Sequence, residues 1–72
     1  MRVVVVGAGE VGTNIAESLA DGHEVVVVER DPDIVDDLTY AMDILAIEGD
    51  GTALDTLREA DVAGADMVVA SN

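Results

Sequence analysis

The sequence predicts one α/β domain whose core is a four-stranded parallel sheet of strand order 3-2-1-4 with three helices. Four short apolar runs, two of which consist of four consecutive valines, alternate with helical patterns. Such runs are typical of parallel strands that are buried on both faces. The resulting β-α-β-α-β-α-β order has short connections, as a parallel α/β sheet requires. Right-handed crossovers place the first two helices on one face, and the third helix must return past the first strand on the other face.

The first strand, Val3–Val6, runs directly into a G-x-G-x-x-G turn that consists of Gly7, Ala8, Gly9, Glu10, Val11 and Gly12. A glycine turn between a buried strand and a helix is the context of a dinucleotide-binding site. Gly7 permits the sharp turn, Gly9 lets the backbone approach a pyrophosphate, and Gly12 lets the helix pack closely. The free N–H groups and the dipole at the helix N-terminus favour anions. A turn that binds nothing is the alternative.

An amphipathic helix is predicted after the turn. Its apolar stripe consists of Val11, Ile15 and Leu19 with Ala16 and Ala20 beside them, and its outer face carries Glu10, Thr13, Asn14 and Glu17. Gly22 is well placed as the left-handed residue that ends the helix. We interpret His23 as a surface turn residue and not as a ligand.

The second strand, Val25–Val28, is followed by Glu29, 22 residues after Gly7. An acidic side chain at this position accepts hydrogen bonds from the adenosine ribose hydroxyls. It would repel a 2′-phosphate, which favours NAD over NADP, although the neighbouring Arg30 can accommodate such a phosphate or stack on adenine. ATP and ADP share the adenosine half and stay open as ligands. The alternative for Glu29 is a solvated carboxylate at the end of a strand.

The second helix has a clear start signal. Asp31 is a capping carboxylate and Pro32 suits the first helical position. Its apolar stripe is predicted to contain Ile34, Leu38, Ala41 and Met42. A third strand, Ile44–Ile47, follows.

The turn after the third strand places Asp50, Gly51 and Thr52 at the same carboxyl edge of the sheet as the glycine turn. Ligands of open α/β sheets bind at that edge, so these residues are predicted to border an adenine pocket. The alternative is a plain turn in which Thr52 and Asp55 form a variant of the capping box. Leu54 and Leu57 are expected to pack a short third helix that ends near Ala60.

A connection over Val62–Ala65 leads through Asp66 to the fourth strand, Met67–Ala70. Ser71 and Asn72 then lie at the ligand edge, where their hydroxyl and amide groups can reach a ribose or phosphate, unless they are simply a frayed terminus. A complete dinucleotide fold has six strands, so this is a truncated Rossmann fold with an open apolar edge. We expect a fragment of a longer protein, or pairing with a second copy as a dimer.

The composition excludes several functions. The formal net charge is -13, with three arginines and no lysine, so direct binding to nucleic acid or anionic lipid is disfavoured. No apolar run is long enough to cross a membrane, which places the domain in the cytoplasm. No metal constellation, nucleophile–base pair or general acid is evident, so no catalytic residue and no metal ligand is predicted. The acidity resembles the adaptation of salt-loving microbes, for which molar salt screens the self-repulsion.

Four segments, VVVVGAGEVG, VVVVERDP, AIEGDGT and LREADVAGADMVVASN, together resemble the N-terminal nucleotide-binding domain of Trk-type potassium uptake regulators. This family is also called TrkA-N, KTN or RCK. The resemblance covers nearly the whole chain and, with the acidity, implies a halophilic archaeal source. It implies that Gly7–Gly12 hold the pyrophosphate of NAD(H) or of ATP/ADP and that Glu29 holds the ribose. Asp50–Thr52 would then flank adenine, and Ser71 and Asn72 would border the region beyond the fourth strand.

The same resemblance implies a regulator without turnover, which passes nucleotide occupancy to a membrane potassium-translocating subunit and thereby associates with the inner face of the cell membrane. Two other functions stay open. One is the cofactor half of an NAD-dependent dehydrogenase, which would require a substrate domain beyond Asn72. The other is an interaction domain that binds no nucleotide.

Overall fold

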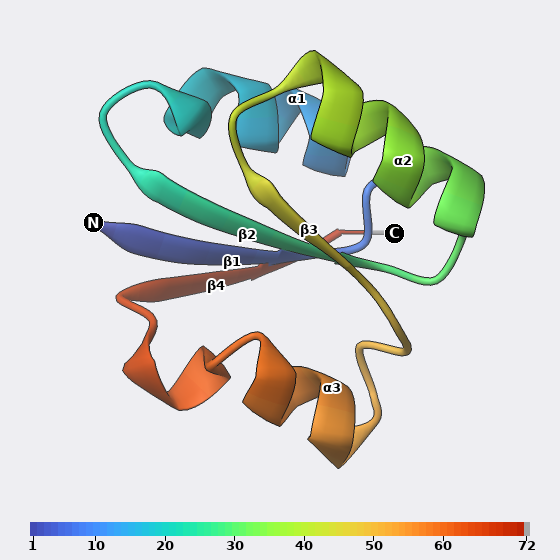
Figure 1. The fold of residues 1–72 in the computed structure, drawn as a ribbon. Coiled ribbons are helices and arrows are strands. Elements are labelled where there is room, and N and C mark those ends of the chain that lie inside the picture. The colour runs from blue at the N-terminus through green and yellow to red at the C-terminus, as the bar shows by residue number, and fades with distance from the viewer. Residues whose placement is uncertain (72) are drawn as a thin grey trace.

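A computed structural model describes residues 1–71 and shows one parallel sheet between two layers of helices (Figure 1). The elements in chain order are β1 (Arg2–Val6), α1 (Glu10–Ala20), β2 (Glu24–Glu29), α2 (Pro32–Ala41), β3 (Leu45–Glu48), α3 (Leu54–Glu59), a 3₁₀ turn (Val62–Gly64) and β4 (Met67–Ala70). The sheet order is β3-β2-β1-β4, and all strand pairs are parallel. The predicted fold class and strand order are confirmed.

The alternation of side chains along the central strands divides the core between the two faces of the sheet. One cluster contains Val3, Val5, Val25, Val27 and Leu38, against which α1 and α2 pack. The other cluster contains Val4, Val26, Val28, Ile47 and Ala60, on the side of α3. Figure 1 shows α1 and α2 together on one face and α3 on the opposite face, as the crossover argument predicts. The central valines are almost completely buried because both layers cover them.

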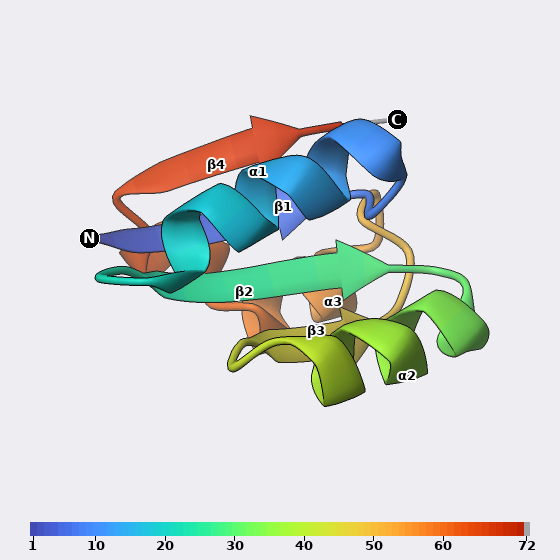
Figure 2. The same ribbon diagram turned by 90° about the horizontal axis from the view of Figure 1, so that it is seen from above.

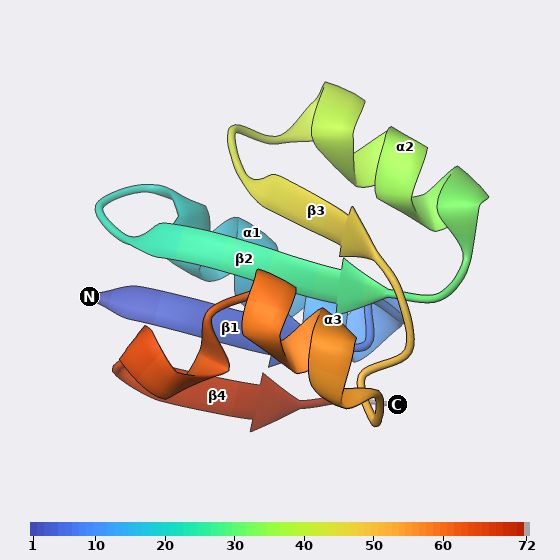
Figure 3. The same cartoon turned by 60° about the horizontal axis from the view of Figure 1, so that its bottom comes forward.

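The single helix α3 covers only part of its face of the sheet (Figure 3). Leu45 on β3 and Val68 on β4 pair with strand residues of the α3-side cluster, yet they are 57% and 47% exposed. Met67, on the opposite face of β4, is 44% exposed. The strand β4 therefore has apolar side chains accessible on both faces.

Several details differ from the sequence prediction. The third strand begins at Leu45 and not at Ile44, because the chain bends over residues 42–44 before it reaches the sheet. Val11 is 60% exposed, because the small residues Gly12 and Ala16 are the ones that face the sheet and rotate Val11 outward.

The apolar stripes of the other two helices are also narrower than predicted. Ala41, in the last turn of α2, is exposed. Leu54 opens α3 at its solvent side and is 60% exposed, whereas Leu57 is half-buried. A helix of six residues presents too short a face to bury both leucines.

The predicted helix boundaries around α1 and α2 are confirmed. The carboxylate of Asp31 accepts a hydrogen bond from the N–H of Asp33 at 2.9 Å, and Pro32 is the first residue of α2. Gly22 has φ +91°, the left-handed conformation expected after α1. His23 is exposed in the turn that leads to β2.

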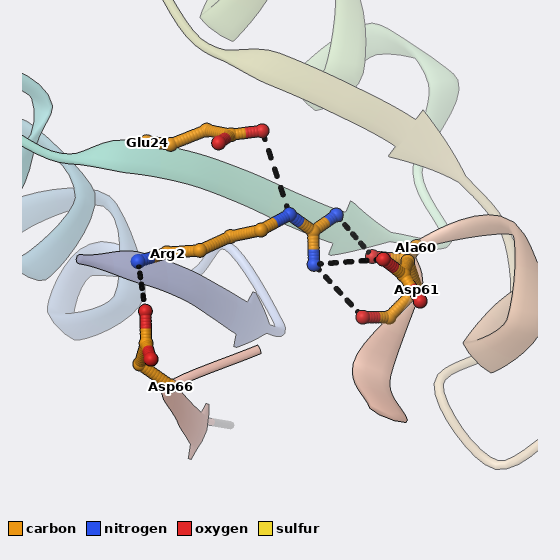
Figure 4. A network of polar contacts seen from close by, with 5 residues as sticks. All are labelled: Arg2, Glu24, Ala60, Asp61 and Asp66. Carbon is orange, nitrogen blue, oxygen red and sulfur yellow. Dashed lines mark hydrogen bonds and ion pairs between the residues drawn. The ribbon is translucent and has the colours of Figure 1, made fainter. Parts of the chain in front are cut away.

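Arg2 ties β1 to the connection between α3 and β4 (Figure 4). Its guanidinium donates to the carbonyls of Ala60 and Asp61, both at 2.8 Å, and forms ion pairs with Glu24 and Asp61. Its backbone N–H donates to the Asp66 carboxylate at 2.7 Å. Asp61 has φ +55°, and the Arg2 contact to its carbonyl helps hold this left-handed conformation. The network lies at the amino edge of the sheet, opposite the glycine turn.

Over residues 1–71, none of the helices combines the length and the hydropathy that crossing a bilayer would demand.

Candidate functional site

A cleft of about 530 Å³ lies at the carboxyl edge of the sheet, a size within the range of small-molecule sites. The loops that follow all four strands contribute to it. Among the residues that line it are Gly7, Gly9, Glu29, Arg30, Asp50, Gly51, Thr52 and Ser71. The fold thus brings most of the predicted site residues to one place.

The glycine turn forms the cleft wall below α1. Gly7 has φ +92° and donates its N–H to the Val28 carbonyl at 2.8 Å, which fixes the turn at the end of β1. A Cβ at Gly12 would overlap the Gly7 carbonyl oxygen, so only glycine allows this close helix–strand packing. Gly9 is the N-cap of α1 and supplies no side-chain cap. The N–H groups of the first turn are consequently free to bind an anion.

Glu29 lies beside this turn and is hydrogen-bonded through both carboxylate oxygens. Oε1 accepts from the Ala8 N–H at 2.9 Å, and Oε2 accepts from the Asp31 N–H at 2.7 Å. The hydrogen bond from Ala8 is the largest cause and the bond from Asp31 the next, and together they hold the pKa of Glu29 below its usual value. The carboxylate is therefore ionised at neutral pH. Each oxygen keeps a further lone pair that can accept from a ribose hydroxyl.

Asp50 and Thr52 form a small polar turn on the opposite wall. One carboxylate oxygen of Asp50 accepts from the Thr52 N–H at 2.8 Å and from the Thr52 hydroxyl at 2.7 Å. Both bonds lower the pKa of Asp50. The predicted capping box is wrong: Ala53 is the N-cap of α3, without a side-chain bond, because Asp50 already engages Thr52.

Arg30 lines the cleft between the end of β2 and the start of α2. Its positive charge lowers the pKa of Glu29 and of Asp50, although in both cases it is a smaller cause than the hydrogen bonds. Arg30 is the basic residue among the described lining residues, so it would act on the phosphate or the adenine of a ligand.

Ser71 brings to the cleft a buried hydroxyl without a hydrogen-bond partner within residues 1–71. Its N–H donates to the Val6 carbonyl at 2.8 Å, which places the side chain above the glycine turn. Its hydroxyl oxygen is buried, lies 3.3 Å from where a Cβ of Gly12 would be, and has no hydrogen-bond partner among the described residues. Leaving a buried hydroxyl without a hydrogen-bond partner costs about 1–3 kcal/mol. A hydrogen bond to a phosphate oxygen or to a water would remove this cost. Asn72, also predicted here, lies outside the described residues.

The remaining predicted residues contribute in other ways. Ala8 is buried below the turn, where its carbonyl accepts from the Thr13 hydroxyl at 3.0 Å. The side chains of Glu10 and Val11 are exposed and do not line the cleft, so their contribution would be through backbone N–H groups.

Five residues that line the cleft were not predicted as site residues: the strand-end residues Val6, Val28 and Ala70, and also Ile34 and Gly49. Ile34 lies in the predicted apolar stripe of α2, and the first turn of this helix contributes to both the core and the cleft wall. A Cβ at Gly49 would lie 2.7 Å from Thr56, so this glycine allows the turn to pack against α3. The G-D-G-T motif, residues 49–52, is the sequence signal from which Gly49 could have been predicted.

The cleft combines the N-terminus of α1 with its free N–H groups, an ionised carboxylate beside it and a polar turn opposite. Among the described residues, no three histidine, aspartate or glutamate side chains are grouped to hold a metal ion. The fold and the cleft together define a Rossmann-type α/β domain with the features of a nucleotide site.

Comparison with known proteins identifies the family. The TrkA-N domain model matches residues 3–72, and the chain belongs to this family. The chain is 40% identical over 70 residues to a Trk system potassium uptake protein TrkA homolog of Archaeoglobus fulgidus, covering 97% of this chain and 16% of that protein. It is 39% identical over 72 residues to a homolog of the same name from Methanothermobacter thermautotrophicus, covering 99% and 33%. Trk system potassium uptake protein TrkA of Halomonas elongata is 37% identical over 71 residues, covering 97% and 16%. The chain thus spans between a sixth and a third of these relatives.

Proposed function

We propose that this domain is the nucleotide-sensing part of a potassium uptake regulator and binds NAD(H) in the cleft at the carboxyl edge of the sheet. One observation carries the proposal: the Glu29 carboxylate lies 2.9 Å from the Ala8 N–H, so the ribose acceptor and the phosphate-binding turn are adjacent. A ligand with a diol next to a pyrophosphate satisfies both groups.

NAD(H) is the preferred ligand because the cleft contains more acidic than basic groups. Among the described residues that line the cleft, Glu29 and Asp50 are acidic and only Arg30 is basic. A dinucleotide carries one charge on each phosphate, whereas ATP adds a terminal phosphate with a higher charge. ADP and ATP are the second ligand class, since they present the same ribose to Glu29. The orphaned Ser71 hydroxyl would donate to the phosphate or to a water that contacts it.

The proposed role is regulation without turnover. The relatives are named for a potassium uptake system, and we propose that this domain passes its nucleotide occupancy to a membrane potassium-translocating subunit. Its location would be the cytoplasm, at the inner face of the cell membrane through that partner. The mechanism would be a population shift, in which a nucleotide favours the domain arrangement that it binds more tightly.

The open side of β4 also enters the proposal. Because Met67 and Val68 are exposed at an edge strand, we propose that this edge is covered in the working protein. Residues 1–72 would then be one part of a longer chain, or would pair with a second copy into a dimer. The two are compatible, and light scattering of the 72-residue domain tests the dimer, since a monodisperse monomer contradicts it.

Calorimetric titration with NADH and, separately, with ATP tests the proposed function. We expect saturable binding of NADH and a weakening of roughly 1–3 kcal/mol in Glu29→Ala, which lacks the ribose acceptor. Glu17→Ala, an exposed carboxylate on α1, is the matched control and should bind as the wild type does. Absence of heat at millimolar NADH and ATP would refute nucleotide sensing.

A further inference from the structure

A second, shallower groove runs between α1 and α2, on the side of these helices that faces away from α3. Its volume is about 450 Å³. The two helices pack on the sheet and have little contact with each other, so β2 is visible between them in Figure 2. This arrangement leaves a channel between two helices, the geometry in which a third helix can bind.

The interior of the groove is apolar. Leu38 and Ala8, both 4% exposed, form its floor, and Ile34 and Met42 are half-buried along the α2 side. Ala41 lies at the rim and is exposed. An apolar side chain entering here would bury surface that the domain itself leaves in contact with water.

The rim of the groove is negative. Glu10 on α1 and Asp37 on α2 are exposed, and Asn14 adds an amide. None of the described residues that line the groove is basic. The whole chain carries a formal net charge of -13, and Glu10 and Asp37 place part of this negative charge at the groove, where it attracts a cationic segment. An apolar floor between acidic rims is complementary to a segment with an apolar anchor flanked by lysine or arginine.

We propose that the α1–α2 groove is the docking site for a basic amphipathic helix of the partner protein. The apolar face of that helix enters the groove, and its lysine or arginine side chains pair with Glu10 and Asp37. The inference rests on the proposed function, because a regulatory domain requires a protein partner. Cytoplasmic segments of membrane proteins carry an excess of lysine and arginine, which matches this chemistry.

The groove also adjoins the nucleotide cleft. Gly9 and Ile34 line both. A helix in the groove therefore contacts the outer side of the same turn that would hold the phosphates. Binding at one site changes the wall of the other, and any coupling between them must be reciprocal.

The test uses a synthetic peptide with leucine at positions i, i+3, i+4 and i+7 and lysine at the others. A second peptide of the same composition but without helical periodicity controls for charge alone. Binding is measured by calorimetry and by NMR of the isotope-labelled domain, in potassium chloride at which the domain is folded. We expect the periodic peptide to shift signals of α1 and α2 that line the groove, and the control peptide to bind at least tenfold more weakly.

Two variant pairs locate the contact. Asp37→Asn should weaken the periodic peptide roughly two- to fivefold, whereas Asp36→Asn, the same charge change one residue away and outside the groove, should have no effect. Ala41→Gln, which adds a longer polar side chain at the rim, should weaken binding of the periodic peptide about tenfold, and Ala63→Gln, exposed on the connection to β4, should not.

Equal effects of Asp36→Asn and Asp37→Asn, or NMR shifts spread over the whole acidic surface, would overturn the docking site. Titration of the same variants with NADH separates the two proposals. Peptide binding in the groove without NADH binding supports the docking site and contradicts nucleotide sensing. NADH binding without peptide binding supports nucleotide sensing and contradicts the docking site.

Discussion

At the scale of single residues, Glu29 connects the end of β2 to the glycine turn and to the start of α2. Its two oxygens accept from Ala8 in the glycine turn and from Asp31 at the start of α2. The carboxylate therefore orders the glycine turn, and in the proposed function it also accepts from a ribose hydroxyl. A residue with both roles should affect stability and ligand affinity, and the two effects can be measured separately.

Glu29→Gln should remove a pH-dependent part of the stability. The pKa of Glu29 is lower in the folded protein than its ordinary 4.5, so its hydrogen bonds stabilise the fold above that pH. The stabilisation, about 1 kcal/mol, is lost as the pH falls through the folded pKa. The difference in unfolding free energy between wild type and Glu29→Gln should be full at neutral pH and shrink in acid. Urea titrations over this range check it.

The unfolding free energy of the variant must be subtracted from that of the wild type, because repulsion among the many acidic residues also decreases in acid. Glu17→Gln, exposed on α1, is the control and should show a small, constant difference. A difference for Glu29→Gln that does not change with pH would show that the two hydrogen bonds do not stabilise the ionised form.

Two glycines should respond differently to alanine. At Gly12 a Cβ would overlap the Gly7 carbonyl oxygen, so Gly12→Ala must displace the helix or the turn. We expect the free energy of unfolding to fall by about 1–3 kcal/mol and NADH binding to weaken. At Gly22 the Cβ meets nothing, and only the left-handed backbone opposes it, at about 1 kcal/mol. Thermal unfolding and NADH titration of both variants check this. Equal nucleotide affinity in both would contradict the close packing at Gly12.

Sequence reasoning at this scale worked where a backbone requirement fixes the residue. The glycine turn, Glu29 and the Asp31–Pro32 helix start have spacings that depend on local geometry, and the structure confirms their placement. The capping box at Thr52 failed because Asp50, two residues earlier, competes for the same groups. The orphaned Ser71 hydroxyl depends on long-range packing above Gly12, and no local pattern reveals it.

At the scale of elements, the short helix α3 depends on Arg2. Over its residues 54–59, α3 itself contains no fully buried residue, so the hydrogen bonds from the guanidinium to Ala60 and Asp61 supplement the packing of the buried Ala60 in holding the end of this helix (Figure 4). Two parallel donors in fixed geometry are specific to arginine.

Arg2→Lys should therefore loosen α3 although the charge is kept. A lysine ammonium cannot reproduce the forked donation to two carbonyls, and we expect a loss of about 1–2 kcal/mol. Hydrogen exchange should accelerate in α3 and the 3₁₀ turn more than in β1 and β2. Arg58→Lys, on the exposed side of α3, is the matched control. Uniform acceleration over the whole chain would contradict a local role for Arg2.

The predicted elements were accurate for the strands that are buried on both faces. The valine runs of β1 and β2 predict central strands, and both are buried. Helix faces were less accurate, because the sequence pattern assigns every apolar residue to the core. Val11 and Leu54 are exposed because small residues and a short helix determine which side faces the sheet.

At the scale of the whole molecule, the formal net charge of -13 on 72 residues should make stability depend on salt. Screening shortens the range of repulsion to about 3 Å at 1 M salt. We expect the melting temperature to rise by roughly 10 °C between about 0.1 M and 2 M potassium chloride. Equimolar sodium chloride should act equally, since the effect is screening. An unchanged melting temperature would contradict the proposed adaptation to high salt.

The topology could be predicted because the crossover rule leaves little freedom once four strands and three helices are assigned. The same rule brings the loops after all four strands to one edge, where the cleft forms. The groove between α1 and α2 could not be predicted in this way, since it depends on the spacing of two helices that do not touch closely.

The central claim is that NAD(H) binds over the glycine turn, and NMR of the isotope-labelled domain titrated with NADH tests it most directly. We expect saturable shifts of backbone signals from Gly7 to Gly12, from Glu29, from Asp50 to Thr52 and from Ser71, with α3 and the Arg2 network unaffected. Absence of shifts at millimolar NADH, or shifts confined to the amino edge of the sheet, would contradict it.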